Sequence, residues 1–510
     1  MAEAWTILSL PSLAYAVSGI LCVFLVSLLW DMYDFRGLPP GPRFSSLPIV
    51  GNLRSLLSDD LKLTRMKKKY GQIVSLKAGC WKIVSAGSPQ ALKEILISKS
   101  ADYAGRPPFH SFLIETLGGK GIAFGNPNTA WKLHRKLFVT SMRYYVSNIP
   151  LIDARITEQA SQLQEFFSKQ QGKPFNPSTV LMKRVADVIC GITFGKYFNS
   201  SHPEFDRFIE LTNLSFGDAE LNEQLSILDL FPISKYFPFS AYKRDQTGTE
   251  LVLLGTIKDV LDQGKANFDA SAEVTDLMNG LLKARSEAEY QNEEEKKALL
   301  SDDYLICTLY DTVSAGYETT VSTLKWAIVY LVNYPQYQQQ IQQEMDKVVG
   351  RDRMPSLTDR PRLPLIQAAL METLRAGNIA DEAIPHYTLK DTTLCGYRVP
   401  KDTVVLPDLE AVHLDPNCWE NPLEFNPYRH LDNEGNLLTS PPNWLPFSAG
   451  RRVCTGESLA KMKLFLFLSW MLHKFTLVPE NEEPPSLEGI KGFTQSPKPF
   501  KIRAIDRYSA

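Results

Sequence analysis

The first strong pattern along the chain is an uncharged, mostly apolar run from Trp5 to Trp30. A helix of these 26 residues would be about 39 Å long, which exceeds the ~30 Å hydrocarbon core of a bilayer. Pro11 can start or kink such a helix, and a kink would shorten the span. Glu3 stands where a cleavable signal peptide would carry basic residues. We therefore expect residues 1–34 to form an uncleaved membrane anchor; the alternative is a buried core helix.

Prolines follow the apolar run. The stretch Leu38-Pro39-Pro40-Gly41-Pro42 predicts a stiff linker over residues 35–50, because proline fixes φ and disfavours helix in the residue before it. Basic residues flank the same region, which favours a cytoplasmic position for the rest of the chain. These are Arg36, Arg43 and Arg54. We expect one catalytic domain over residues 51–510.

The remaining pattern is mainly helical. Alternating positions predict two short strands, at Ile73–Ala78 and Lys82–Ser85, whereas most of the region from about 87 to 390 has helical spacing with polar loops. The clearest helix begins after Ser301, an N-cap followed by acids, and ends before Pro335. Its apolar residues recur every three or four positions, which marks one buried face. The pattern predicts a mainly α protein with small β-sheets.

Charge and cysteine usage exclude several classes of function. With 55 basic and 57 acidic residues the net charge is −2, so we expect no nucleic-acid partner. The seven cysteines are scattered and form no C-x-x-C pair, which argues against a disulfide framework and a zinc site. No dinucleotide-binding glycine motif occurs, so nicotinamide binding has no support in the sequence.

One cysteine stands in a loop with a distinctive composition. Cys454 lies in Phe447-Ser-Ala-Gly450-Arg-Arg452-Val-Cys-Thr-Gly, directly ahead of an apolar helical run. Backbone N–H groups, a helix N-terminus and a nearby cation each favour a thiolate, and a thiolate can be the axial ligand of a haem iron. A buried inert cysteine is the alternative, but it does not explain the spacing of Phe447, Gly450 and Arg452. The stretch resembles the haem-binding loop F-x-x-G-x-R-x-C-x-G of the cytochrome P450 family.

A second segment, in the middle of the long helix, resembles the same family. Ala315-Gly316-Tyr-Glu318-Thr319-Thr320 is similar to the family's A-G-x-[DE]-T-T segment. The resemblance implies that Thr319 is the oxygen-side hydroxyl, that Glu318 is the proton-relay acid, and that Ala315 and Gly316 border the substrate. Without the resemblance, the residues are more typical of a kinked helix with a back-bonded threonine.

Two further motifs resemble structural parts of that family. Glu372 and Arg375 lie one helical turn apart and can pair, and with Arg429 they are similar to the family's three-residue ion network, a structural rather than catalytic feature. His430 and Glu410 stand where the family usually has aromatic residues, so local packing there is expected to differ.

Basic residues from distant segments are expected to bind the haem propionates. Trp131 and Arg135 resemble the family's W-x-x-x-R helix, and Arg106, His386 and Arg452 fall where its other propionate partners lie. Each of them could instead be a surface residue, but several cations converging on one place suit a dianionic cofactor better.

The segment after Arg375 departs from the family pattern. Asp381 and Glu382 stand where apolar residues usually line the substrate pocket. Either both face solvent, or one enters the pocket and binds a hydroxyl or amine of the substrate. With Ile379 and Phe493, they are the candidate pocket residues on this side.

Taken together, the resemblance implies the triangular-prism P450 fold with haem b, in a monooxygenase anchored in the endoplasmic reticulum membrane. NADPH–cytochrome P450 reductase is the implied electron donor and cytochrome b5 a second one. The short strings Val412–Asp415 and Pro485–Gly489 look most like animal steroid 17α- and 21-hydroxylases, which implies a small apolar substrate. Two alternatives remain open at this point: a haem-thiolate isomerase that rearranges a peroxide, and a non-catalytic haem-dependent sensor.

Overall fold

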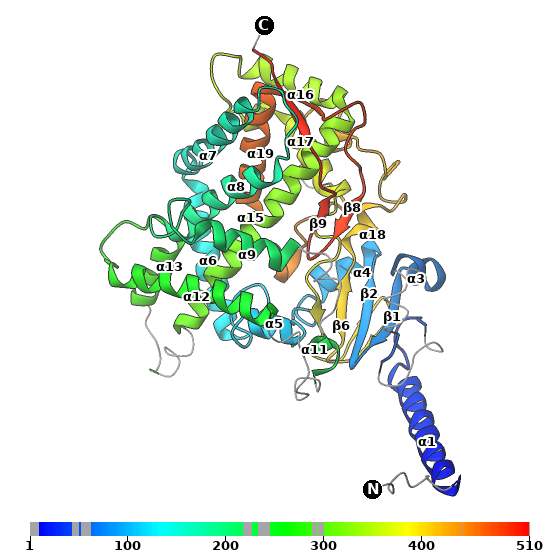
Figure 1. Cartoon of the computed structure of the whole chain (residues 1–510). Helices are drawn as coiled ribbons and strands as arrows, with labels where there is room; N and C mark the ends of the chain where they lie inside the picture. The colour runs from blue at the N-terminus through cyan, green and yellow to red at the C-terminus, as the bar shows by residue number, and fades with distance from the viewer. Residues whose placement is uncertain are drawn as a thin grey trace, which may run out of the picture. The chain divides into compact units, whose positions relative to one another are not determined.

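The computed structural model describes residues 10–42, 50–52, 63–217, 227–232, 245–287, 293, 300–439 and 441–508. Backbone contacts divide the chain into two compact units. The smaller unit comprises Met1–Pro107 and Ile384–Asp408, and the larger comprises Pro108–Ala383 and Leu409–Ala510. Figure 1 shows the elements of both.

The smaller unit is built on a four-stranded sheet in the order β1-β2-β6-β3. β1 and β2 form the antiparallel hairpin that the alternating pattern predicted, with Val74 opposite Ser85, and β6 runs parallel to β2. A second hairpin pairs β4 with β5. The elements of this unit are α1 (Leu10–Asp34), α3 (Leu63–Tyr70), β1 (Ile73–Ala78), β2 (Trp81–Ala86), α4 (Pro89–Lys93), the π-helix η3 (Glu94–Ser98), β3 (His386–Tyr387), β4 (Thr392–Leu394), β5 (Tyr397–Val399) and β6 (Val404–Pro407).

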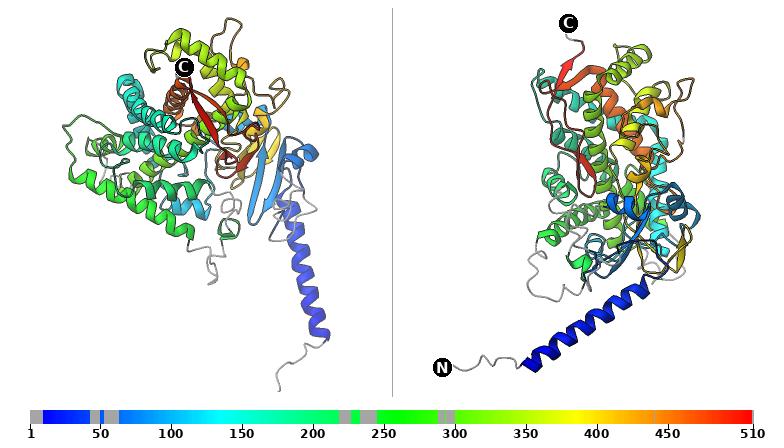
Figure 2. Two further views of the ribbon diagram at one scale, coloured as in Figure 1. Left: turned by 45° about the horizontal axis from the view of Figure 1, so that its top comes forward. Right: turned by 90° about the vertical axis from the view of Figure 1, so that its right-hand side faces the viewer.

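The helix α1 is seen most clearly in Figure 2, where it is dark blue. Pro11 is the second described residue of this helix. Its last turns are tied to the sheet by two ion pairs, Asp31 with Lys77 at 2.6 Å and Asp34 with Lys82 at 3.0 Å. Within the segments that the structure describes, no helix meets the length and apolarity needed to cross a membrane.

The proline-rich segment packs against strand β1. Leu38 is buried, and the backbone N–H of Ser75 donates to the carbonyl of Pro40 at 2.9 Å. A side chain at Gly41 would collide with the backbone of Ser75, so glycine allows this close approach. The expected linker is therefore held along the sheet over residues 35–42, and residues 43–49 lie outside the described part.

The larger unit is mainly helical, with small antiparallel pairs β7–β10 and β8–β9. Its elements are α5 (His110–Glu115), α6 (Thr129–Ser147), α7 (Ile149–Lys169), α8 (Ser178–Phe194), α9 (Phe205–Gly217), α11 (Ile227–Leu230), α12 (Asp245–Ala266), α13 (Leu277–Glu287), α15 (Asp302–Asn333), α16 (Pro335–Val348), η6 (Arg360–Arg362), α17 (Pro364–Ala376), α18 (Leu409–His413), η7 (Pro427–His430), η8 (Gly450–Arg452), α19 (Glu457–Lys474), β7 (Phe475–Pro479), β8 (Gly489–Lys491), β9 (Gln495–Pro497) and β10 (Ile502–Asp506).

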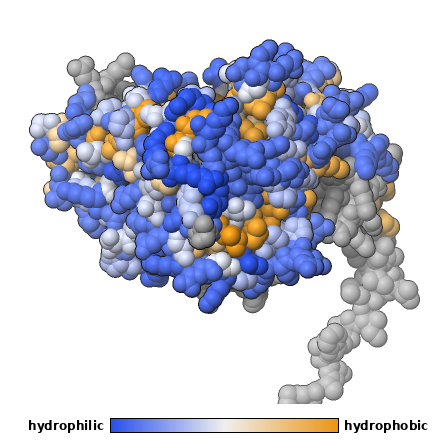
Figure 3. Space-filling view, turned by 90° about the horizontal axis from the view of Figure 1, so that it is seen from above, coloured by the Kyte–Doolittle hydropathy of each residue, from blue (hydrophilic) through white to orange (hydrophobic). Residues whose placement is uncertain are grey.

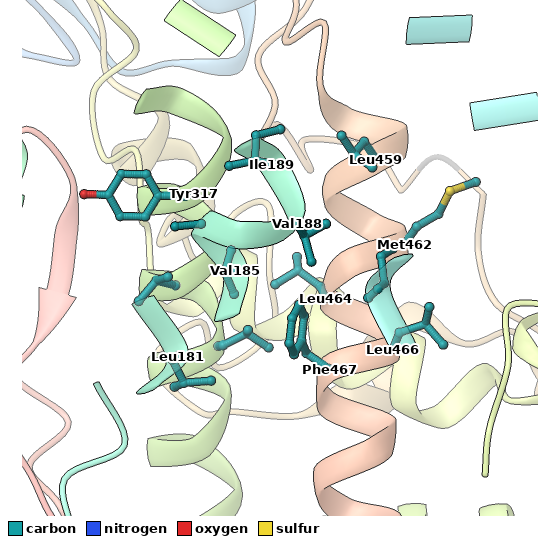
Figure 4. Packing of buried hydrophobic residues seen from close by; sticks show 14 of the residues in the cluster. Leu181, Val185, Val188, Ile189, Tyr317, Leu459, Met462, Leu464, Leu466 and Phe467 are labelled. Carbon is teal, nitrogen blue, oxygen red and sulfur yellow. The ribbon is translucent and has the colours of Figure 1, made fainter. Parts of the chain in front are cut away.

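Helix α15 is the long helix predicted from the sequence, with Ser301 at its N-cap and Pro335 just beyond its end. It is buried around most of its circumference and contacts both α8 and α19. The close-up of Figure 4 shows Val188 of α8, Tyr317 of α15 and Leu464 of α19 within one cluster of buried apolar side chains. These apolar contacts hold α15 and α19 in fixed positions, and each of these helices carries part of the candidate site.

Polar and apolar side chains are distributed differently between the surface and the interior. The face in Figure 3 is largely hydrophilic, with small, separate hydrophobic areas. Large apolar side chains are instead concentrated inside the larger unit, where Trp326, Phe467 and Tyr317 are almost completely buried. Burial of this apolar surface is the main favourable contribution to folding.

Candidate functional site

The backbone of the cysteine loop is closed by its own hydrogen bonds. The N–H of Cys454 donates to the carbonyl of Phe447 at 3.0 Å, and the N–H of Val453 donates to that of Gly450 at 3.2 Å. Gly450 has φ of +69°, a conformation that favours glycine, and Ser448 also has positive φ. The sequence spacing of Phe447, Gly450 and Cys454 therefore reflects a turn that presents the cysteine directly before α19.

The Cys454 thiol is accessible but surrounded by protein. Its side chain is exposed, yet burial of the site raises the pKa of the thiol. The Gly456 N–H and the charges of Arg135 and Lys463 oppose that rise. A bound metal ion would supply the missing positive charge and deprotonate the thiol. A cysteine that a ligand can reach, in surroundings with little water, is suited to bind a haem iron.

Trp131 of α6 organises the basic residues near this loop. The centre of the Arg452 guanidinium lies 4.5 Å from the centre of the Trp131 ring, within cation–π range. Trp131 Nε1 donates to the carbonyl of Ile122 at 3.0 Å, and Arg452 Nη2 donates to that of Gly125 at 2.7 Å. The loop between α5 and α6 thus fixes both side chains.

Arg135 connects α6 with the cysteine loop. Its Nη2 donates to the carbonyl of Val453 at 2.9 Å, and its guanidinium also lies over the Trp131 ring. Burial lowers the pKa of Arg135, and burial together with repulsion from Arg135 lowers the pKa of Arg452 to about 9. An anionic group bound beside these two cations would offset both effects. Their chemistry therefore fits the carboxylates of a haem.

Asp311 of α15 also positions this cluster, and sequence reasoning missed it. Its buried Oδ2 accepts hydrogen bonds from the N–H groups of Ile122 at 2.7 Å and Ala123 at 3.0 Å. Burial raises the pKa of Asp311 to about 6. The signal available in the sequence was an acid within the mostly apolar stretch Leu305–Val313 of this helix, one turn before Ala315.

The middle of α15 presents a short accessible surface. Ala315 is exposed, whereas Gly316 and Thr319 are partly exposed, in a helix that is otherwise largely buried there. Thr319 Oγ1 donates to the carbonyl of Ala315 at 2.8 Å, the back-bond expected of a helical threonine. A Cβ at Gly316 would lie 2.7 Å from Ile189 Cγ1 of α8. The glycine therefore allows close packing of two helices.

Glu318 points to a different neighbour, the β8–β9 hairpin. Its Oε1 accepts hydrogen bonds from Thr494 Oγ1 at 2.6 Å and from Ser322 Oγ at 2.9 Å. Burial raises the pKa of Glu318, and these two hydrogen bonds oppose the rise. A carboxyl with a raised pKa takes up and releases protons nearer to neutral pH, which suits proton transfer.

Lys463 is a second residue that sequence reasoning missed. This buried lysine of α19 donates from Nζ to the carbonyl of Gly316 in α15. Burial lowers the pKa of its ammonium group to about 7, and Cys454 opposes the shift. Lys463 therefore joins the helix that follows the cysteine loop to the accessible segment of α15.

The expected ion network is assembled in the structure. Arg375 binds both carboxylate oxygens of Glu372 at 2.8 Å, and Arg429 Nε donates to Oε1 at 3.0 Å. His430 is a further member, with Nε2 2.9 Å from Glu372 Oε2. Although burial opposes it, hydrogen bonds from Arg375 and His430 lower the pKa of Glu372 to about 2. The histidine that departs from the family pattern therefore supports the network.

Arg106 and His386 both belong to the smaller unit. Arg106 Nη1 donates to the carbonyls of Ile384 at 2.7 Å and Pro385 at 2.9 Å. His386 Nδ1 lies 2.8 Å from the carbonyl of Tyr103. These contacts fix both side chains beside one strand end, and their role toward a propionate stays a prediction.

The two acids that departed from the family pattern occupy a polar surface cluster. Asp381 Oδ2 lies 2.8 Å from Lys491 Nζ, and Glu410 Oε2 lies 3.1 Å from the same amine. The side chain of Asp381 is 19% exposed, and Glu382 is partly buried, with its N–H donating to Asp381 Oδ1 at 2.8 Å. Asp381 therefore forms an ion pair with Lys491. A role of Asp381 or Glu382 in substrate selection stays a hypothesis.

The remaining pocket candidates have different surroundings. Ile379 is buried, and its carbonyl accepts from the N–H of Gln495 at 2.9 Å. Phe493 is 40% exposed and lies edge-on to Phe124, with ring centres 6.3 Å apart. Phe493 therefore offers an accessible apolar surface, whereas Ile379 mainly supports the hairpin.

Comparison with known proteins gives consistent results. The family model described as Cytochrome P450 matches residues 39–504. A steroid 17-alpha-hydroxylase/17,20 lyase of Ictalurus punctatus is 36% identical over 96% of this chain and 95% of its own length. A Cytochrome P450 2U1 of Rattus norvegicus is 32% identical over 96% of both.

A solved structure titled as a zebra fish cytochrome P450 with progesterone has a TM-score of 0.76 and 30% identity. It covers 88% of this chain and 100% of its own. A second zebra fish structure, titled with abiraterone, has a TM-score of 0.75 and 31% identity, and covers 89% of this chain and 100% of its own. The expected P450 fold, mainly α with small β-sheets, is thereby confirmed.

Proposed function

The chain belongs to the cytochrome P450 family of oxygenases, and from that premise we propose that it is a membrane-anchored monooxygenase acting on a steroid-like substrate. The observation that carries the proposal is the geometry around Cys454. An accessible cysteine stands before α19, next to Arg135 and Arg452, two cations disfavoured by burial.

Three residues of the larger unit would hold the haem most directly. Cys454 would ligate the iron, and Arg135 and Arg452 would neutralise propionates, with Trp131 keeping both guanidiniums in place. Phe447 and Gly450 shape the loop that carries the ligand. When bound, the haem supplies the activation of dioxygen, and a thiolate ligand favours cleavage of its O–O bond.

The protein's contribution to the reaction lies in α15. Ala315, the exposed small residue of this segment, would border the substrate, and Gly316 beside it is partly exposed although its Cβ position faces Ile189. Thr319, whose hydroxyl donates to the Ala315 carbonyl and is partly exposed, would be the hydrogen-bond donor on the oxygen side of the site. Glu318 would hold the proton that the reaction consumes.

The anchor, the redox partners and the location are proposed on the sequence. The uncharged run Trp5–Trp30 supports anchoring, as do the exposed apolar side chains Leu25, Leu29 and Trp30 of α1. Such an anchor favours NADPH–cytochrome P450 reductase as the donor, with cytochrome b5 as a second one, at the cytoplasmic face of the endoplasmic reticulum.

The steroid proposal rests on relatives whose names describe steroid hydroxylases. Its test is titration of the purified holoenzyme with progesterone and pregnenolone, with fatty acids and amines as comparison ligands. We expect a low- to high-spin absorbance change with a steroid, because the ligand displaces iron-bound water. No change with any steroid would contradict the substrate class and leave the oxygenase assignment intact. Turnover that persists without NADPH and reductase would instead favour an isomerase.

A further inference from the structure

A row of polar side chains extends from Glu318 along one face of α15. Glu318, Ser322 and Lys325 are four and then three residues apart, so they lie on the same side of the helix. Ser496 of strand β9 lies beside them and completes the row. None of these three additional residues has a part in the proposed chemistry described above.

The hydrogen bonds in this row form a continuous chain. Lys325 Nζ donates to Ser496 Oγ at 3.4 Å, and Ser496 Oγ lies 2.6 Å from Ser322 Oγ. Ser322 Oγ donates to Glu318 Oε1 at 2.9 Å. If the Ser496 hydroxyl donates to Ser322, every bond has the same direction, from the amine toward the carboxylate. Such an arrangement allows a proton to pass by successive transfers.

The two ends of the chain differ in exposure. Lys325 and Ser496 are partly exposed, whereas Ser322 and Glu318 are buried. Among the described residues, Glu318 Oε2 has no hydrogen-bond partner, so one oxygen of the carboxyl stays available for a further transfer. The hydrogen-bonded row therefore connects the partly exposed Lys325 with the buried Glu318, which is next to Thr319.

We propose that Lys325, Ser496 and Ser322 form the route by which protons from solvent reach Glu318. The inference rests on the proposed monooxygenase function, in which O2 + RH + 2 e⁻ + 2 H⁺ gives ROH + H2O. The reductase supplies the electrons, and the route supplies protons. The amine of Lys325 gives a proton toward Ser496 and recovers one from water.

The electrostatics of both ends support this direction. Burial lowers the pKa of Lys325, so its ammonium group releases a proton more readily. Burial raises the pKa of Glu318, so its carboxylate accepts one more readily. A role in fixing the hairpin alone would need the hydrogen bonds but not the ability to exchange protons.

The test uses the full-length holoenzyme with reductase and compares wild type with Ser496→Ala, Lys325→Met and Ser314→Ala. Ser314 is the matched control, because its buried hydroxyl bonds only to the carbonyl of Tyr310 in the same helix among the contacts of the described residues. Three quantities are measured: product per NADPH, hydrogen peroxide released, and the solvent isotope effect on NADPH-supported turnover. Peroxide-supported turnover, RH + H2O2 → ROH + H2O, is measured in parallel because hydrogen peroxide brings its own protons and electrons.

The proposal predicts that Ser496→Ala and Lys325→Met lower product per NADPH on the order of tenfold. Peroxide release and the solvent isotope effect should rise, and peroxide-supported turnover should stay within about twofold of wild type, as a loss of proton supply predicts. Ser314→Ala should resemble wild type in every assay. Unchanged coupling in Ser496→Ala, or an equal loss in both turnover modes, would overturn the route. If wild type forms no product in either mode, the monooxygenase proposal itself is wrong.

Discussion

At the scale of single residues, burial works against several charges near the candidate haem site. Arg135 and Arg452 are disfavoured as cations, and Asp311 is disfavoured as an anion. A protein keeps such groups where a ligand or a nearby backbone requires them. Asp311 accepts hydrogen bonds from the backbone of the loop that carries Ile122, and the two arginines are the groups proposed above to bind the propionates.

The pKa of Asp311 predicts a distinctive pH dependence of stability. The folded-state pKa is about 6 and the ordinary value 3.8, so the folded protein binds more protons between these values. Its contribution to stability is therefore lost as pH rises through this window, by up to about 3 kcal/mol. Asp311→Asn should remove this slope, because the amide oxygen can accept from Ile122 and Ala123. Urea unfolding of wild type and variant between pH 4 and 7 checks the difference; parallel curves would contradict it.

The ion network around Glu372 predicts a pH dependence of stability with the opposite sign to that of Asp311. The folded-state pKa of Glu372 is about 2 against an ordinary 4.5, so the stability it contributes is present above pH 4.5 and is lost as pH falls toward 2. Glu372→Gln should lower the free energy of unfolding by about 3–5 kcal/mol, because two arginines lose their buried counter-charge. His430→Phe should cost only about 1–3 kcal/mol, the loss of one buried hydrogen bond. Equal losses in the two variants, measured by urea unfolding at pH 7, would contradict this division.

At the scale of elements, the site depends on how closely α8, α15 and α19 approach one another. Gly316 lies against Ile189 of α8, and its carbonyl accepts from Lys463 of α19. Gly316 therefore contacts α8 through its Cα side and α19 through its carbonyl. Small shifts of either neighbour would move the segment that carries Thr319.

Gly316→Ala tests this packing. The new Cβ would stand 2.7 Å from Ile189 Cγ1, so the buried isoleucine must move, at a cost of about 1–3 kcal/mol despite the better helix propensity of alanine. Adding Ile189→Ala should recover part of that loss, which a double-mutant cycle of unfolding free energies measures. Ser314→Ala on the same helix is the control. Additive losses would show that the two side chains do not meet.

Local patterns predicted the elements well because their causes are local. The ends of α15 follow from Ser301 and Pro335, and the β1–β2 hairpin follows from alternation around a glycine turn. The parts that sequence reasoning missed depend on partners far along the chain. Asp311 bonds to a backbone 189 residues away, and Lys463 to one 147 residues away. No spacing rule connects such positions in a single sequence.

Resemblance to the family supplied the rest of the candidate site. It grouped Trp131 with Arg135 and Arg452, and the larger unit brings these three side chains together. It gave no guidance at His430, where the chain departs from the family pattern and the structure shows an added member of the ion network.

At the scale of the whole molecule, the two units contain different parts of the proposed enzyme. The smaller unit carries the sheet, helix α1 and the ion pairs that tie that helix to β1 and β2. The larger unit carries the cysteine loop, the accessible segment of α15 and the polar row that ends at Lys325. An oxygenase in which ligand, oxygen-side hydroxyl and proton supply share one helical core is the account we propose.

The absorbance spectrum of the reduced carbon monoxide complex tests that account most directly. Wild type should give the spectrum of a thiolate-ligated haem, and Cys418→Ala should give the same spectrum, because that cysteine lies outside the loop. Cys454→Ala should lose the thiolate spectrum even where haem stays bound, since the variant lacks the proposed sulfur ligand. Survival of the thiolate spectrum in Cys454→Ala would contradict the assignment of Cys454 as the iron ligand and the function built on it.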